Sequence, residues 1–260
     1  MILNCRMGIG AGVGPHFFLI CGAALLVTLT GCKKDPPPVD VVLDWKTQDG
    51  FEQQGILYTP KQENPPGLIL VHAYGGNRGD WELFAVRARA HGYMVLAYDM
   101  RGHGFSTKQN GKSARYNRFD RKDWRRAITD IGFAKKQLID QGASTNNLFI
   151  VGASIGANMA VEYASKDDEI QAVILLSPGI EYKGIGIEKT IKANRRLPIL
   201  LMTAEGDRYS AKSAEKMKAW SPSYTELRTY AGTSHGTDLV SRTERIIEDI
   251  FVWLKPIVEE

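Results

Sequence analysis

Runs of apolar residues alternate with segments of helical periodicity from residue 41 to the end of the chain. A short run in which nearly every position is apolar predicts a strand that is buried on both faces of a sheet. The first run alternates polar and apolar positions instead, which is typical of a half-exposed edge strand. The expected strands are VVLDWKT (41–47), GILYTP (55–60), GLILVHA (67–73), YMVLAYD (93–99), NLFIVG (147–152), IQAVILLSP (170–178), LPILLMTAEGD (197–207) and YTELRTYAG (224–232).

Between these strands, apolar residues recur every three or four positions, which predicts amphipathic helices. The expected helices cover residues 79–91, 123–141, 155–166 and about 238–254. Asp123 is a candidate N-cap for the second helix. Strands that alternate with helices predict an α/β fold with a mostly parallel central sheet of about eight strands. Ligands bind such sheets at the carboxyl ends of the strands, so the chemistry is expected in the loops that follow them.

The first 31 residues have the pattern of a secretory signal rather than of a folded element. They contain one basic residue, Arg6, no acidic residue, and an apolar run from Phe17 to Leu29 that ends in small residues. The sequence Leu29-Thr30-Gly31-Cys32 resembles the lipobox of bacterial lipoproteins, in which the cysteine is acylated and becomes the mature N-terminus. An uncleaved signal anchor and an ordinary secretory signal are the alternatives, although a run this short is a poor membrane span.

The cysteine content agrees with this resemblance. The chain has three cysteines, Cys5, Cys21 and Cys32, so cleavage would leave one thiol and acylation would occupy it. We therefore expect an exported protein that a lipid at Cys32 anchors in the membrane of a bacterial cell envelope. Lys33-Lys34 after the cysteine favours the outer membrane if the cell has one. The expected organisation is a signal peptide at 1–31, the lipidated cysteine and a proline-rich, extended tether at 32–40, and one folded domain at 41–260.

Net charge and motif content exclude several classes of function. The formal charge is +4, from 33 Lys and Arg and 29 Asp and Glu, and we find no nucleic-acid footprint of basic and aromatic residues. The histidines after residue 40 are scattered, without an H-E-x-x-H motif or a Cys/His cluster. No glycine-rich phosphate loop follows a strand. We therefore expect no nucleic-acid partner, no metal and no cofactor, and the oligomeric state stays open.

One motif has the form of a nucleophile elbow. Gly152-Ala153-Ser154-Ile155-Gly156 matches G-x-S-x-G and lies between an expected strand and an expected helix. A serine nucleophile must project from a tight turn, and the flanking glycines leave room for the neighbouring backbone. The helix that follows directs free N–H groups toward developing negative charge. Alone the motif is weak, because Ser154 could be an ordinary small residue where a strand meets a helix.

Two later residues supply the partners that a serine nucleophile needs. A serine requires a base to take its proton, and the base requires an orienting carboxylate. Asp207 directly follows an expected strand, His235 follows the last one, and the order Ser154, Asp207, His235 is the order expected for this elbow. Asp207 could instead begin a turn or helix, and His235 could be an exposed loop residue. Glu205 is the competing acid. The ordered set of three favours a Ser-Asp-His triad.

Beyond these motifs, the chain resembles the α/β-hydrolase superfamily over about residues 45–255. The loop His72-Ala73-Tyr74-Gly75-Gly76 corresponds to the H-G-x-G loop of these enzymes, with Ala73 where glycine is commoner. The resemblance implies that the backbone N–H groups of Tyr74 and Ile155 form the oxyanion hole, and that His72 braces the loop rather than acting as a base. Within the superfamily, the chain looks most like small dienelactone-hydrolase-like or serine-aminopeptidase-like esterases.

A second stretch, YDMRGHGFS (98–106), is similar to the D-x-R-G-H-G-x-S segment of these hydrolases. Asp99 and His103 could take part in chemistry, but the triad is already complete, so we expect this segment to shape the wall of the pocket. From their loop positions, the residues expected to line the substrate pocket are Tyr74, Trp81, Met100, Tyr182 and Tyr209.

The segment 179–196, where larger lids are often inserted in this superfamily, has room only for a loop and a short helix, which predicts an open site. Its basic residues could favour anionic substrates, face a charged membrane surface, or form a solvated helix face. These observations predict a serine hydrolase that cleaves carboxylic esters through an acyl-enzyme. The alternatives are a peptidase or thioesterase with the same triad, and a non-catalytic lipid-anchored binding protein on a hydrolase fold.

Overall fold

The structure, a computed structural model, describes residues 40–241 and 243–259. The expected signal peptide at 1–31, the expected lipidation site Cys32 and all of the tether except Asp40 lie outside the described residues. Within the described part of the chain, no helix is long and apolar enough to span a bilayer.

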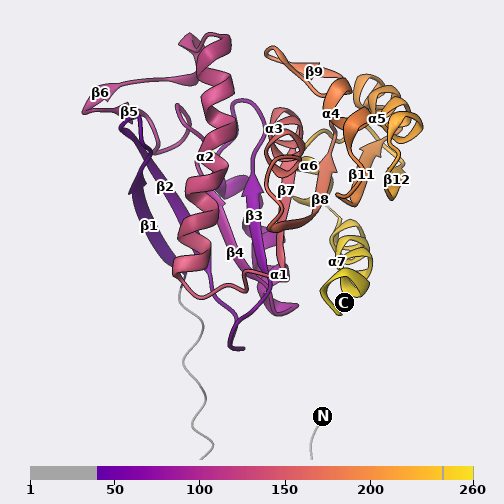
Figure 1. Cartoon of the computed structure of the whole chain (residues 1–260), viewed down its shortest axis with the longest axis horizontal. Coiled ribbons are helices and arrows are strands. Elements are labelled where there is room, and N and C mark those ends of the chain that lie inside the picture. The colour runs from indigo at the N-terminus through magenta and orange to yellow at the C-terminus, as the bar shows by residue number, and fades with distance from the viewer. Residues whose placement is uncertain (1–39, 242, 260) are drawn as a thin grey trace, which may run out of the picture. The chain divides into compact units, whose positions relative to one another are not determined.

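A sheet of ten strands forms the centre of the domain, in the order β12-β11-β8-β7-β3-β4-β2-β5-β6, with β1 also paired to β2 (Figure 1). The five pairs from β12 to β4 are parallel, and the pairs made by β1, β2, β5 and β6 are antiparallel. The strands are β1 (Val41–Lys46), β2 (Phe51–Tyr58), β3 (Gly67–Val71), β4 (Met94–Tyr98), β5 (Lys108–Gln109), β6 (Lys112–Ser113), β7 (Leu148–Ala153), β8 (Ile170–Leu176), β11 (Ile199–Ala204) and β12 (Thr225–Tyr230). The prediction of an α/β fold with a mostly parallel sheet is confirmed. The sheet contains two short strands, β5 and β6, in addition to the eight expected ones.

Helices cover both faces of this sheet (Figure 1). The helices are α1 (Glu82–Ala90), α2 (Arg121–Asp140), α3 (Ile155–Ala164), α4 (Glu188–Ala193), α5 (Arg208–Trp220), α6 (Asp238–Ser241) and α7 (Glu244–Glu259). Ile131 of α2, Met159 of α3 and Met217 of α5 belong to one core cluster. Phe84 of α1 and Ile250 of α7 belong to the other. One of the two core clusters packs against each face of the sheet, so the central strands are buried on both faces.

The structure differs from the sequence-based expectation at one helix start. Asp120, not Asp123, is the N-cap of α2, and its side chain accepts hydrogen bonds from the backbone of Lys122 and Asp123. Asp123 completes a capping box, because its carboxylate accepts from the backbone N–H of Asp120 at 3.1 Å. The prediction of Asp123 as N-cap is therefore wrong by three residues, about one helical turn, although Asp123 does help to start the helix.

Helix α5 is absent from the expected elements. Its buried positions are Ser210, Ser213, Ala214 and Met217. These positions have the spacing of one helix face, although two of the four side chains are serines. The closing helix expected at about 238–254 is divided into α6 and α7. The segment 179–196 forms a hairpin, β9 (Glu181–Tyr182) with β10 (Ile185–Gly186), before the short α4.

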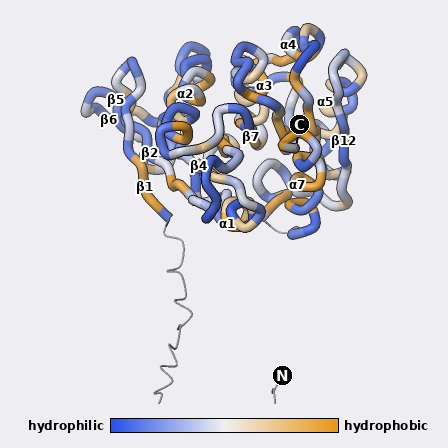
Figure 2. Tube along the Cα trace, turned by 60° about the horizontal axis from the view of Figure 1, so that its bottom comes forward, coloured by the Kyte–Doolittle hydropathy of each residue, from blue (hydrophilic) through white to orange (hydrophobic). Residues whose placement is uncertain are grey.

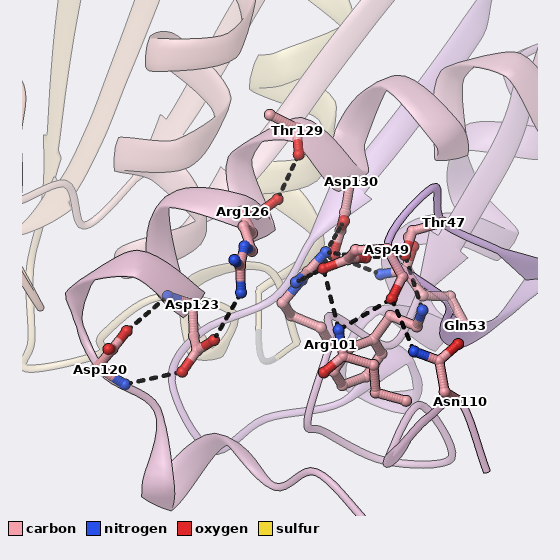
Figure 3. A network of polar contacts seen from close by, with 12 residues as sticks. Thr47, Asp49, Gln53, Arg101, Asn110, Asp120, Asp123, Arg126, Thr129 and Asp130 are labelled. Atoms are coloured by element: carbon pink, nitrogen blue, oxygen red, sulfur yellow. Dashed lines mark hydrogen bonds and ion pairs between the residues drawn. The ribbon is translucent and has the colours of Figure 1, made fainter. Parts of the chain in front are cut away.

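A buried polar network joins the β1–β2 turn to α2 (Figure 3). Arg101 donates from Nε and Nη2 to the carboxylate of Asp130 at 2.6 and 2.5 Å, and from Nη1 to Asp49 at 2.9 Å. Gln53 donates to Asp130 at 3.0 Å and accepts from Trp45 Nε1 at 3.0 Å. The Arg101 and Asp130 side chains are only 3% and 1% exposed. The network satisfies the buried charges and fixes the edge of the sheet against the helix.

The parallel strands all end at one edge of the sheet, which we call the carboxyl edge. The chain enters β1 at Val41, and β1 runs toward the carboxyl edge because it is antiparallel to β2, which is antiparallel to β4. The domain is therefore entered from the opposite edge. Ser154 directly follows β7, so it lies at the carboxyl edge.

Candidate active site

Ser154 occupies a strained turn between β7 and α3. Its backbone has φ 56° and ψ −120°, a conformation that non-glycine residues adopt rarely and chiefly at functional sites. A Cβ on Gly152 would lie 2.3 Å from the carbonyl oxygen of Gly156, and one on Gly156 would lie 2.3 Å from that of Val71. Both positions therefore require glycine, which explains the G-x-S-x-G spacing in steric terms.

The structure brings Ser154, Asp207 and His235 together at the carboxyl edge. His235 Nε2 lies 2.8 Å from Ser154 Oγ, and its Nδ1 lies 2.7 Å from Asp207 Oδ2. The carboxylate can only accept, so Nδ1 donates and Nε2 is free to accept the serine proton. Ser154 is 5% exposed, and the His235 side chain is 43% exposed. A hydroxyl that is hydrogen-bonded to an oriented imidazole has the geometry of an activated nucleophile.

The structure also bears on the alternative roles that the sequence left open for these residues. Asp207 is the N-cap residue of α5, but its side chain makes no capping hydrogen bond; it binds His235 instead. Glu205, the competing acid, is exposed, and its backbone N–H donates to the carbonyl of Tyr230. His235 lies in the loop between β12 and α6. Three loops that are far apart in the sequence therefore supply the three side chains.

The loop after β3 reaches the same place. A Cβ on Gly236 would lie 3.5 Å from that of Ala73 and 3.7 Å from that of Ser154, so the loop, the elbow and the His235 segment meet there. Gly76 donates its N–H to the carbonyl of Ala73 at 3.0 Å, and Gly75 has φ 75°. The loop thus forms a tight turn beside the elbow.

His72 braces this loop, in agreement with the role that the resemblance implied. Its Nδ1 donates to the carbonyl of Ala73 at 2.8 Å, and its Nε2 accepts from the backbone N–H of Met100 at 3.0 Å. Both ring nitrogens are therefore used. Complete burial lowers the pKa of His72 to about 4, so the ring is neutral at pH 7 and has no free lone pair for proton transfer.

Asp99 and His103 are structural as well. The Asp99 carboxylate accepts from the backbone and guanidinium of Arg78 at 2.7 and 2.8 Å and from the backbone of Phe105 at 2.9 Å. The His103 ring stacks on Tyr116, with the centroids 4.0 Å apart. Burial, and secondarily the nearby His72, lower the pKa of His103 to about 3. Neither side chain is placed to exchange protons with substrate.

Two of the expected pocket residues are placed wrongly by sequence reasoning. Trp81 is 0% exposed and packs on Phe84 in the core beneath α1. Met100 is 1% exposed in the core beneath α2. Large apolar side chains in a loop next to a sheet are drawn into the core when space remains there, because burial stabilises them. Neither residue lines an accessible pocket.

Of the other expected pocket residues, Tyr182 lies beside the triad. The ring centroid of Tyr182 is 6.5 Å from that of His235 and 5.6 Å from that of Tyr209. The Tyr182 hydroxyl is hydrogen-bonded to the Ser210 hydroxyl at 3.3 Å. Tyr209 is 49% exposed. Tyr74 is 43% exposed. These three rings flank the site on both sides, Tyr182 and Tyr209 after β8 and β11 and Tyr74 after β3.

Sequence reasoning did not find the aromatic residues that support Tyr74. Tyr116 packs edge-on against it at 5.0 Å, and Trp124 lies 5.8 Å away. Both residues belong to the stretch 115–126, which is rich in basic and aromatic residues. The prediction of no nucleic-acid footprint includes this stretch. Tyr116 and Phe119 are half-buried and Trp124 is buried, so these rings pack inward and are not free to stack on bases. No sequence pattern marks Tyr116 as a neighbour of the oxyanion loop.

The described residues contain no group of three or more His, Cys, Asp or Glu side chains that could hold a metal ion. Ser154 Oγ and the His235 ring are hydrogen-bonded within the triad, and the phenol of Tyr182 also lies within reach of the Ser154 hydroxyl. The contact of His235 Nε2 with Ser154 Oγ is suited to proton transfer from the hydroxyl to the imidazole.

Comparison with known proteins shows the family to which the chain belongs. The sequence profile of the serine aminopeptidase S33 family matches residues 63–193, half of the chain. The matched region contains the loop at 72–76 and Ser154, and it ends before Asp207 and His235. A curated relative, an uncharacterised abhydrolase domain-containing protein from Dictyostelium discoideum, is 31% identical over 127 residues. The match covers 48% of this chain and only 12% of that relative.

Solved structures of hydrolases share the fold. A thermostable carboxyl esterase from Bacillus coagulans superposes with a TM-score of 0.69 and 12% identity, over 84% of this chain and 99% of that one. A dienelactone hydrolase from Anabaena variabilis superposes with a TM-score of 0.66 and 14% identity, over 84% of this chain and 97% of that one. At these identities the likeness shows the α/β-hydrolase fold alone.

Proposed function

The chain belongs to the serine aminopeptidase S33 family of hydrolases, and on this premise we propose that it cleaves carboxylic esters through an acyl-enzyme on Ser154. The observation that carries the proposal is the pair of hydrogen bonds that His235 makes, 2.8 Å to Ser154 Oγ and 2.7 Å to Asp207. A non-catalytic binding protein has no need of a strained serine in this arrangement. The family and the fold support a hydrolase, and the ester is our own inference.

The proposed cycle has two halves. As Ser154 Oγ attacks the ester carbonyl carbon, His235 Nε2 takes the hydroxyl proton, and Asp207 stabilises the imidazolium through Nδ1–H. The tetrahedral intermediate collapses when the C–O bond to the alcohol breaks and His235 returns the proton to the leaving oxygen. Water then enters, His235 takes its proton, and attack on the acyl-enzyme releases the acid and restores the Ser154 hydroxyl.

The negative oxygen of each tetrahedral intermediate would be bound by the backbone N–H groups of Tyr74 and Ile155. Ile155 is the first residue of α3, so its N–H has no partner within the helix. Tyr74 lies in the turn that His72 braces. Donors held before the reaction lower the barrier because they need no reorganisation when the charge develops.

Peptidase activity is the second candidate, and the family description favours it. A thioesterase could use the same three side chains. Ester cleavage is preferred because the site is open: the His235 side chain is 43% exposed, and an alcohol leaves more easily than an amine, which must be protonated as it departs. The solved neighbours described above include a carboxyl esterase.

The test uses a fluorophosphonate probe, which labels activated serines, on the purified full-length protein. We expect labelling of the wild type and loss of labelling in Ser154→Ala and in His235→Ala. Ser165→Ala, at the other end of α3, is the matched control and should be labelled normally. Labelling that survives in Ser154→Ala would overturn the assignment, and an unlabelled wild type would favour the binding-protein alternative.

Substrate class is tested with the same proteins and three probes: 4-nitrophenyl butyrate, a butyryl thioester and aminoacyl 4-nitroanilides. The ester should be cleaved fastest relative to its uncatalysed hydrolysis. Faster relative cleavage of the anilides would assign the protein as a peptidase, and that of the thioester as a thioesterase.

We also propose that the protein is exported and anchored by lipid at Cys32 in a bacterial envelope, at the outer membrane if there is one. The support is the lipobox-like sequence and the tether that follows it. The chain enters the domain from the edge opposite to Ser154.

Metabolic labelling with palmitate tests the anchor. The wild type and Cys21→Ala should incorporate the label and fractionate with membranes, whereas Cys32→Ala should do neither. A Cys32→Ala protein that is still labelled would show that the acyl group is attached elsewhere.

A further inference from the structure

The β9–β10 hairpin carries a lysine to the mouth of the site. Lys183 and Gly184 form its two-residue turn, with φ 51° and 80°. Positive φ at both positions is the type I′ pattern, in which Asn, Asp or Gly normally occupies the first position. A lysine there is strained, because its Cβ is crowded in the left-handed conformation. Local turn chemistry therefore does not explain why Lys183 is at this position.

The Lys183 side chain reaches a residue of the loop that follows β3. Its Nζ lies 4.2 Å from the ring centroid of Tyr74, within the range of a cation–π contact. Lys183 follows β8 in the chain and Tyr74 follows β3, and β7, which carries Ser154, lies between these two strands. The ammonium group of a residue that follows β8 is thus held against the ring of a residue that follows β3.

The base of the hairpin is fixed to the helix that begins at the elbow. Asn158 of α3 is fully buried, and its amide donates to the carbonyls of Gly179 and Ile185 at 2.9 and 3.0 Å. Its carbonyl accepts from the backbone of Gly179 at 3.2 Å. On the strand before the turn, Tyr182 packs beside His235. The hairpin is therefore a positioned element of the site and not a free loop.

A second cation stands at the same turn. A Cβ on Gly184 would lie 2.5 Å from Nε of Arg121 and 3.2 Å from its Cγ, so this arginine lies along the turn. Neither Lys183 nor Arg121 forms an ion pair with any residue that the structure describes. The Glu181 carboxylate lies near Gly186, on the far strand of the hairpin. Two adjacent cations without a counter-ion repel one another, and an anion placed between them would relieve this.

The surrounding surface has the same sign. Residues 108–126 contain eight Lys and Arg and two Asp, a formal charge of +6 against +4 for the whole chain. Both aspartates are used in the capping box of α2. This segment, from β5 to the first turns of α2, lies at the carboxyl edge and is strongly hydrophilic (Figures 1 and 2). A cleft bordered by one sign of charge raises the local concentration of oppositely charged substrates.

We infer that the esters cleaved at Ser154 carry an anionic group, a carboxylate or a phosphate, which binds between Lys183 and Arg121. This inference rests on the proposed esterase function and specifies its substrate class. It also disfavours an aminopeptidase, because the charged N-terminus of a peptide would be repelled by the same two cations.

The test compares matched charged and neutral esters. In one arm, the acyl group differs: mono-4-nitrophenyl glutarate against 4-nitrophenyl valerate. In the other, the leaving group differs: 4-nitrophenyl acetate with and without a ring carboxylate. The measured quantity is the ratio of kcat/KM for the anionic ester to that for the neutral one, so the intrinsic reactivity of each ester cancels when proteins are compared.

We expect Lys183→Met to lower this ratio about five- to tenfold in at least one arm, mainly through KM, because the lost charge acts in partly screened solvent. Lys183→Arg should retain most of the ratio. Lys189→Met, which removes another exposed lysine of the same segment, should leave both kcat/KM values unchanged. The wild-type ratio should also fall as ionic strength rises from about 0.01 to 0.3 M, because the Debye length shortens.

An unchanged ratio in Lys183→Met in both arms at low salt would overturn the inference. The neutral esters and the fluorophosphonate probe report on the proposed function separately. If these are inert, the esterase proposal fails and the anionic specificity fails with it. If they react and the ratio does not depend on Lys183, only the specificity is refuted.

Discussion

Replacing Asp207 with asparagine tests the proposed triad more sharply than removing the serine, because it leaves the shape of the site intact. Asp207 Oδ2 lies 2.7 Å from His235 Nδ1. The carboxylate fixes the tautomer in which Nε2 can accept the Ser154 proton, and it stabilises the imidazolium that forms. An asparagine removes the charge, and its amide can donate to Nδ1, which favours the wrong tautomer.

The expected loss follows from two contributions. A carboxylate and an imidazolium about 3–4 Å apart attract by about 4–5 kcal/mol at an effective dielectric constant of about 20. The His235 side chain is 43% exposed, so solvent screening leaves about 2–3 kcal/mol. The mismatched hydrogen bond adds about 1–2 kcal/mol. A total of about 3–5 kcal/mol corresponds to a fall in kcat of about 10²–10⁴-fold.

The assay is the steady-state hydrolysis of 4-nitrophenyl butyrate by the wild type, Asp207→Asn and Glu205→Gln. Glu205 is the other acid after β11, and it is exposed, so its variant is the matched control and should retain activity within about twofold. The free energy of unfolding of each variant should be measured alongside. A loss in Asp207→Asn of less than about tenfold, or an equal loss in Glu205→Gln, would refute the assignment of Asp207.

Two further predictions concern stability. Asp130→Asn leaves the guanidinium of Arg101 without its main partner in a buried network. Urea unfolding should therefore show a free energy of unfolding that is about 3–5 kcal/mol lower. The control Asp123→Asn, at the surface, should lower it by less than about 1 kcal/mol, and similar losses in both variants would contradict the account. Burial lowers the pKa of His72 from 6.5 to about 4. As pH falls, the unfolded state therefore takes up a proton before the folded state does. The free energy of unfolding should fall between pH 6.5 and 4, by at most about 3 kcal/mol from this residue. Urea unfolding between pH 7 and 4.5 checks this: the pH slope should be shallower in His72→Gln, and an equal slope would show that His72 does not carry the effect.

Much of the fold could be predicted because its signals are local. The central strands are continuous apolar runs such as GLILV and FIV, since a strand covered on both faces has no polar position to alternate with. Helix α2 shows a clear amphipathic period. Helix α5 was missed although its buried residues Ser210, Ser213, Ala214 and Met217 have helical spacing, since two of these four are polar. The hairpin at 181–186 was missed because a lysine occupies the first position of its turn.

The candidate site could also be predicted only where its signals are local. Gly152, Ser154 and Gly156 could be named from their spacing, because backbone crowding at a tight turn imposes residue types at fixed offsets. Asp207 and His235 could be named from their order after strands. Trp81 and Met100 were placed wrongly, because whether a loop side chain faces the pocket or the core depends on the space that other segments leave.

The sequence by itself determined the class of fold and the ordered residues that could form a nucleophile, a base and an orienting acid, since these depend on period, spacing and chain order. Only the tertiary structure decided which polar groups meet. It directed Asp207 to His235 instead of to the cap of α5, used both nitrogens of His72 in the core, and brought Lys183 and Arg121 together from segments about 60 residues apart. Such meetings depend on how distant loops converge at one edge of the sheet, and no local pattern in the sequence records that convergence.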